Sequence, residues 1–147
     1  MSKQKIYLDC CCFNRPFDDA GIDKVRLESE AVLTIIDRGE AGLWDICKSD
    51  ILLDEMIEMP DKLKLQRVLA LYSAAAVNIA LCDDIIKRAR ELSKGGIKAY
   101  DALHIASAEY AKADVLLTTD KRLINAAKNA AKIRVLNPLV WLMEVLQ

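Results

Sequence analysis

Residues 99–120 read AYDALHIASAEYAKADVLLTTD, and this stretch decides the fold class of the chain. Its alanine-rich first part, 99–112, predicts a helix, and the run VLLT at 115–118 predicts a strand that is buried on both faces. A second helix is expected over 121–131, directly after Asp120. A short apolar strand between two helices is typical of a parallel sheet that helices cover.

The same alternation continues toward both ends of the chain. Further strands are predicted at 5–9, 43–47, 77–81 and 133–136. Further helices are predicted at 23–38, 49–59, 63–75 and 83–94, and an apolar tail follows at 139–146. Strands that alternate with helices of this length imply parallel crossovers. We therefore expect a three-layer α/β/α fold with a mostly parallel central sheet of four to five strands, formed by 1–147 as a single domain.

The composition excludes several classes of protein. With 53% hydrophobic and 29% charged residues, the chain is not of the disordered class. The net charge of −1 gives no overall attraction to nucleic acid, so such binding would need a local basic patch or a metal ion. No apolar run reaches the roughly 18 residues of a membrane span, and MSKQKIYLD lacks a signal-peptide core. We expect a cytoplasmic protein without membrane association, and reduced thiols for its five cysteines.

Two acids follow predicted strands. Asp9 ends the first strand and Asp120 ends the VLLTT strand. Both would lie at the carboxyl edge of the sheet, where ligands bind in open α/β folds. Each could equally serve only as a helix cap or a turn residue.

Two more acids lie on predicted helices. Glu55 shares a helix face with the apolar Ile51 and Leu52, although it could be a rim carboxylate that reaches solvent. Asp101 is the only acid in the run AYDALHIASA, and charged side chains are rarely buried without a partner or a ligand. Asp101 could instead complement the helix dipole. His104, one turn later, could pair with Asp101 or be a packed structural residue.

Four carboxylates at one sheet edge would need a cation, because like charges at close range raise each other's pKa. Oxygen ligands of this kind suit Mg²⁺ or Mn²⁺. Two such ions could activate a water molecule and stabilise the leaving oxygen of a phosphodiester. The spacing of the acids is compatible with this chemistry.

Four segments of the chain resemble the PIN-domain nucleases, a family that includes the VapC-type toxins of toxin–antitoxin pairs. They occur in the family's order and cover almost the whole chain: YLDCCCFNRPFDD at 7–19, SDILLDE at 49–55, AYDALHIASA at 99–108 and LLTTDKRL at 116–123. The resemblance implies a Mg²⁺- or Mn²⁺-dependent endoribonuclease that cleaves single-stranded or structured RNA. By matching position, it implies these catalytic and metal-binding residues: Asp9, Glu55, Asp101 and Asp120. It also implies two supporting residues: Asn14 and Thr118.

The resemblance also implies partners for this chain. At one place the sequence departs from the family's usual pattern. It implies an RNA substrate and a homodimer, and it makes an antitoxin protein a candidate partner. Residues 10–12 are cysteines where the family usually has Thr or Ser with an Asn, so a thiol replaces a small hydroxyl after Asp9. The alternative function is a PIN-like domain that has lost turnover and binds RNA or protein.

Three other families fit less well. A haloacid-dehalogenase-like phosphatase would have a second acid where Cys11 stands. A receiver domain would have paired acids before the first helix and a lysine after the last strand, where Asn137 and Pro138 follow here. A P-loop or Rossmann nucleotide binder would have a glycine-rich loop after the first strand.

Two groups of residues allow contacts beyond the acids. The tail predicts an apolar stripe that packs on the sheet or forms a homodimer or antitoxin surface: Trp141, Leu142, Val145 and Leu146. Five basic residues near the acidic segments could contact phosphates: Arg15, Lys94, Lys98, Lys121 and Arg122.

Overall fold

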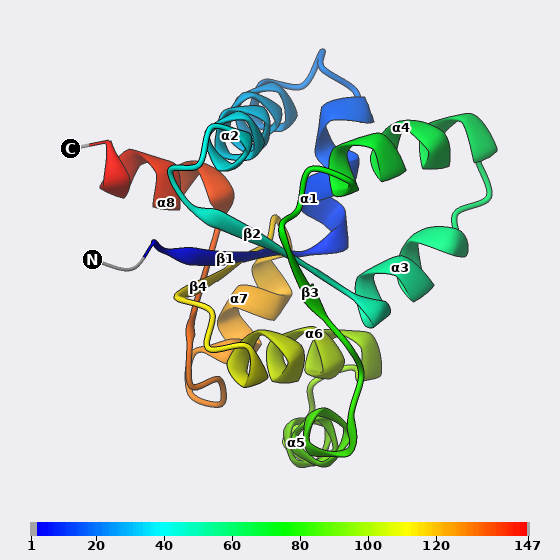
Figure 1. Ribbon diagram of the computed structural model, residues 1–147, viewed down its shortest axis with the longest axis vertical. Coiled ribbons are helices and arrows are strands. Elements are labelled where there is room, and N and C mark those ends of the chain that lie inside the picture. Colours follow the sequence, from blue (N-terminus) through cyan, green and yellow to red (C-terminus); the bar gives the residue numbers. More distant parts are fainter. Residues whose placement is uncertain (1–2, 147) are drawn as a thin grey trace.

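A five-stranded parallel sheet forms the centre of the molecule in the computed structural model, which describes residues 3–146 (Figure 1). The strands lie in the order β3-β2-β1-β4-β5. Their bounds are Lys5–Leu8 for β1, Asp45–Ser49 for β2, Val77–Ile79 for β3, Val115–Leu117 for β4 and Arg134–Leu136 for β5. All carboxyl ends therefore meet at one edge of the sheet.

Helices cover both faces of this sheet, and a short 3₁₀ turn follows the first of them. Figure 1 shows α2, α4 and α8 on one side and α5 and α6 on the other. The bounds are Cys10–Asn14 for α1, Asp23–Glu40 for α2, Asp50–Ile57 for α3, Lys62–Tyr72 for α4, Asp83–Lys94 for α5, Ala99–Tyr110 for α6, Lys121–Ala127 for α7 and Pro138–Val145 for α8. The predicted α/β/α class with a parallel central sheet is confirmed.

The main difference from the sequence prediction lies directly after β1. The first strand ends at Leu8, and Asp9 caps a short helix by accepting a hydrogen bond from the backbone N–H of Cys10 (2.8 Å). A five-residue helix shows too little periodicity to be recognised from sequence. The second strand also begins two residues later than predicted, because the turn after α2 needs the positive φ of Gly42 (88°).

The apolar tail forms α8 and contributes to the core. Trp141 is 2% exposed and packs edge-on against Trp44, with ring centroids 5.0 Å apart. Leu142 is also buried, whereas Leu146 is exposed. The predicted stripe thus packs inward only in part. Among residues 3–146, no helix has both the length and the apolar character that crossing a bilayer requires.

Candidate metal centre

Asp9 lies where β1 meets β4, and three hydrogen bonds fix its position. Its backbone N–H donates to the carbonyl of Leu117 (2.9 Å), which continues the sheet by one residue. Its carboxylate accepts from Cys10 N at one oxygen and from the Thr118 hydroxyl at the other, both at 2.8 Å. The Asp9 side chain is therefore rigid and almost fully buried.

One pocket of about 360 Å³ brings the acids together at the carboxyl edge of the sheet. Asp9 and Asp120 reach it from the ends of β1 and β4, Glu55 from α3, and Asp101 from the first turn of α6. Both acids at strand ends also cap helices, since Asp120 accepts from the backbone N–H of Arg122 (2.9 Å). Capping and lining the pocket are therefore compatible roles for the same carboxylate.

Glu58 also lines this pocket, and the sequence analysis missed it. Helical periodicity places Glu58 with Asp54 on a solvent-facing side. However, α3 ends at Ile57 and Glu58 is its C-cap residue, so the helical face no longer determines where this side chain lies. An early helix end leaves little signal in the sequence.

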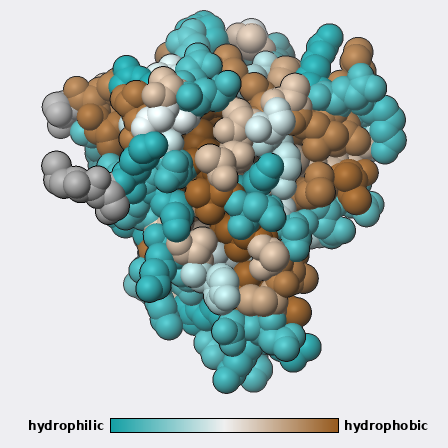
Figure 2. Space-filling view, viewed as in Figure 1, coloured by the Kyte–Doolittle hydropathy of each residue, from teal (hydrophilic) through white to brown (hydrophobic). Residues whose placement is uncertain are grey.

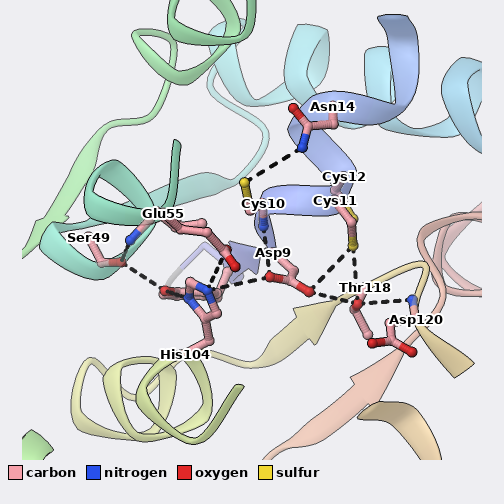
Figure 3. A network of polar contacts seen from close by, with 12 residues as sticks. Asp9, Cys10, Cys11, Cys12, Asn14, Ser49, Glu55, His104, Thr118 and Asp120 are labelled. Atoms are coloured by element: carbon pink, nitrogen blue, oxygen red, sulfur yellow. Dashed lines mark hydrogen bonds and ion pairs between the residues drawn. The ribbon is translucent and has the colours of Figure 1, made fainter. Parts of the chain in front are cut away.

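His104 contacts Glu55 and Asp9. The sequence left open a pair with Asp101 or a packed structural residue. The Nε2 atom of His104 lies 3.0 Å from a carboxylate oxygen of Glu55 and 3.6 Å from one of Asp9 (Figure 3). One atom from each of these three side chains falls within 4.8 Å of the other two. His104 itself is completely buried beneath the two acids.

A chain of buried hydrogen bonds continues behind His104. The Nδ1 atom lies 2.7 Å from the Tyr7 hydroxyl, which lies 2.8 Å from the Ser49 hydroxyl. The Ser49 oxygen in turn accepts from the backbone N–H of Leu52 as the N-cap of α3 (3.1 Å). In the neutral ring, Tyr7 donates to Nδ1 and the hydrogen is on Nε2; in the protonated ring, Nδ1 donates to the Tyr7 oxygen instead. In both forms His104 presents an N–H to Glu55. This chain fixes the orientation of the imidazole.

The electrostatics of the site favour a proton on His104. Burial, the largest effect, lowers the pKa of His104, but the hydrogen bond to Glu55 and the charges of Asp9, Glu55 and Asp101 outweigh it, and the pKa is raised. In its protonated form, His104 balances part of the negative charge of the acids. The remaining negative charge is open to a cation.

Thr118 and Cys11 support the acids from the other side. The Thr118 hydroxyl donates to Asp9 and accepts from the backbone N–H of Asp120 (3.1 Å), so it links two of the four acids. The Cys11 sulfur lies 3.3 Å from the Thr118 hydroxyl and 3.4 Å from the Asp9 carboxylate. Asn14 lines the pocket, but its amide donates to the Cys10 sulfur (3.7 Å).

The family model described as PIN domain matches residues 7–129. The chain belongs to the PIN-domain family. Members of this family are nucleases. No curated protein matches this PIN domain.

Two solved structures resemble this PIN domain in fold. One is VapBC2 from Rickettsia felis bound to a DNA fragment from its promoter, with 18% identity, a TM-score of 0.62, and coverage of 91% of this chain and 98% of that chain. The other is PAE2754 from Pyrobaculum aerophilum, with 16% identity, a TM-score of 0.57, and coverage of 96% and 90%. At these identities, the likeness is one of fold.

The carboxyl group of Asp101 in this PIN domain has a raised pKa. Burial is the largest cause of its pKa being raised above the ordinary 3.8, and the charge of Asp9 adds to it. His104 opposes the shift, while Asp120 and Glu55 increase it. A cation bound among these carboxylates would relieve the repulsion, so the donor set fits a hard divalent ion.

Asp101→Asn is expected to stabilise the metal-free PIN domain at neutral pH. Because the folded-state pKa of Asp101 is raised, the wild-type free energy of unfolding falls as pH rises from near 3.8 through that higher pKa. The loss of stability is complete above the folded-state pKa. Asparagine does not ionise, so the variant does not lose stability in this way. Urea denaturation in EDTA should give a larger free energy of unfolding for the variant than for the wild type at pH 7. This difference should become smaller as the pH is lowered. Identical pH dependence of the free energy of unfolding in the two proteins would contradict the raised pKa of Asp101.

Proposed function

We propose that this chain is a Mg²⁺- or Mn²⁺-dependent endoribonuclease whose metal is held by Asp9, Glu55, Asp101 and Asp120. One observation carries the proposal: four carboxylates from separate segments of the chain line a single pocket at the carboxyl edge of a parallel sheet. That edge is where α/β folds bind ligands, and a pocket of about 360 Å³ can admit part of a polynucleotide.

The chemistry divides between the ion and the side chains that hold it. A divalent ion bound here would supply an activated water and would stabilise charge on the leaving oxygen of a phosphodiester. The protein keeps its ligands in place: Thr118 and Cys10 N hold the Asp9 carboxylate, and His104 holds Glu55. These contacts reduce the reorganisation that metal binding requires.

The Cys10 thiol, which lines the pocket, is not suited to hold a metal ion. Burial, followed by the charges of Glu55 and Asp9, raises the pKa of the Cys10 thiol far above its usual value. Cys10 therefore stays protonated, and a protonated thiol is a poor metal ligand. Most of the donors that line the pocket are carboxylate oxygens, which favour Mg²⁺ and Mn²⁺ over softer ions.

Metal-dependent cleavage of a mixed-sequence single-stranded RNA tests the proposal. We expect products with Mn²⁺ or Mg²⁺ and none with EDTA. Calorimetric titration of the same protein with Mn²⁺ provides a readout that does not depend on knowing the target sequence. Metal binding without cleavage of any RNA would favour the alternative, a PIN-like module that binds RNA or protein without turnover.

An exposed apolar surface supports a protein partner for this chain. Leu53 and Ile57 on α3 and Leu63 on α4 are exposed, and hydrophobic surface lies over these helices at the right of Figure 2. This surface borders the acidic pocket, since Glu55 and Glu58 belong to α3 and its end. With VapBC2 among the similar structures, we propose an antitoxin protein as the partner. Homodimer formation and a cytoplasmic location stay predictions.

A further inference from the structure

A second, smaller pocket adjoins the acidic one. It has a volume of about 180 Å³, lies between the beginnings of α6 and α7, and shares Asp101 and Asp120 with the larger pocket. Lys98 and Arg122 form part of its lining. Two carboxylates of the candidate metal centre thus face a compartment that also contains two cationic side chains.

The acidic pocket offers carboxylates for a metal ion, whereas the smaller pocket also offers cations for a phosphate. Among the described residues, no lysine or arginine lines the acidic pocket itself. A polynucleotide that approaches four carboxylates nevertheless needs cations to hold its backbone, because phosphate contacts provide most of the affinity of such complexes. The smaller pocket both touches the acids and offers such cations.

Lys98 and Arg122 are also available for a ligand. Both are exposed, and within residues 3–146 no ion pair joins either side chain to an acid. Arg15 differs, because it lies 3.1 Å from both the buried Glu28 and Asp18. Lys94 lines a separate, mainly apolar groove between α5 and α6. Lys121 lines neither the acidic pocket nor the smaller one. Lys98 and Arg122 thus differ from the other three basic candidates.

We propose that this smaller pocket binds a backbone phosphate of the RNA substrate next to the phosphate that is cleaved, with Lys98 and Arg122 as its ligands. The proposal rests on the endoribonuclease function proposed above. A pocket of about 180 Å³ is smaller than the roughly 300–1,000 Å³ typical of whole small-molecule ligands, and it suits a single charged group. Arg122 can contact two phosphate oxygens at once, while Lys98 adds a point charge.

The test compares RNA binding by the wild type and by the double variant Lys98→Ala/Arg122→Ala. Fluorescence anisotropy with a labelled single-stranded RNA is followed in EDTA, which prevents metal-dependent cleavage, at a series of salt concentrations. Each lost phosphate contact reduces the slope of log K against log salt by about 0.7 for single strands, so we expect a reduction of about 1.4 in the double variant. Arg122→Lys should restore part of the affinity relative to Arg122→Ala.

Lys24→Ala is the matched control, because Lys24 is an exposed cation on α2, on the opposite face of the sheet from α6. It should leave the slope unchanged. Equal slopes in the wild type and the double variant would overturn the phosphate site, as would the absence of any RNA binding by the wild type. A reduced slope in a protein that cleaves no RNA with Mn²⁺ or Mg²⁺ would support the phosphate site and contradict the nuclease function, so the two failures are distinguishable.

Once a cleaved bond has been mapped, an RNA with one uncharged backbone linkage allows a more specific test. An RNA with an uncharged methylphosphonate next to that bond should bind the wild type more weakly than the fully charged RNA does. The double variant should bind both RNAs equally, because its phosphate ligands are gone. An equal penalty in both proteins would overturn the assignment of Lys98 and Arg122 to this phosphate.

Discussion

Asp9→Asn and Asp101→Asn are each expected to abolish metal-dependent RNA cleavage, with rates at least roughly 1,000-fold below the wild type. A catalytic metal supplies several kcal/mol of transition-state stabilisation, and each ~1.4 kcal/mol is a factor of ten in rate. Asparagine keeps the size of the side chain and one oxygen acceptor. At Asp9 it can still accept from Cys10 N or Thr118. The substitution therefore removes a metal ligand with little change in packing.

Cleavage rates and Mn²⁺ affinity should be measured together for these variants. Asp37→Asn is the matched control, because Asp37 is an exposed acid on α2, on the other face of the sheet from α6. It should cleave RNA and bind Mn²⁺ like the wild type. Full activity with an unchanged metal response in both Asp9→Asn and Asp101→Asn would contradict the assignment of these residues to the metal.

His104→Ala is expected to lower Mn²⁺ affinity or cleavage by about 10- to 100-fold, the usual effect of removing a group that orients a metal ligand. His104 touches Glu55 at 3.0 Å and is held behind by Tyr7 at 2.7 Å. Without the imidazole, Glu55 loses its partner and the buried Tyr7 hydroxyl loses one of its two contacts. The free energy of unfolding should fall by about 1–3 kcal/mol.

Weaker metal binding by His104→Ala could come from a misoriented Glu55 or from a general loss of stability, and two further variants distinguish these causes. His104→Gln retains an amide N–H that can donate to Glu55, so it should recover much of the Mn²⁺ affinity. Tyr7→Phe keeps the buried ring but removes the hydroxyl that contacts Nδ1, so it should weaken metal binding less than His104→Ala does. Wild-type Mn²⁺ affinity in a folded His104→Ala protein would contradict the orienting role of His104.

Local sequence patterns were enough to predict the sheet and the edge that carries the site. Short apolar runs such as VLLT between helices require a parallel arrangement, because only buried strands are apolar on both faces. Parallel strands bring their carboxyl ends to one edge. Asp9 and Asp120 were therefore placed close together by local pattern alone, and helical spacing placed Glu55 and Asp101 on inward faces.

Which side chains meet across different helices and strands depends on the packing of these elements, and the sequence did not predict it. The sequence left two interpretations of His104 open, a pair with Asp101 one turn away or a packed structural residue. In the structure, α3 packs against α6 and brings Glu55, 49 residues away, to the imidazole. Arg15 was a candidate phosphate contact, but it is held by Glu28 of α2. Periodicity gives the face of a helix on which a side chain lies. What lies opposite that face depends on how the elements pack, and no local pattern contains that information.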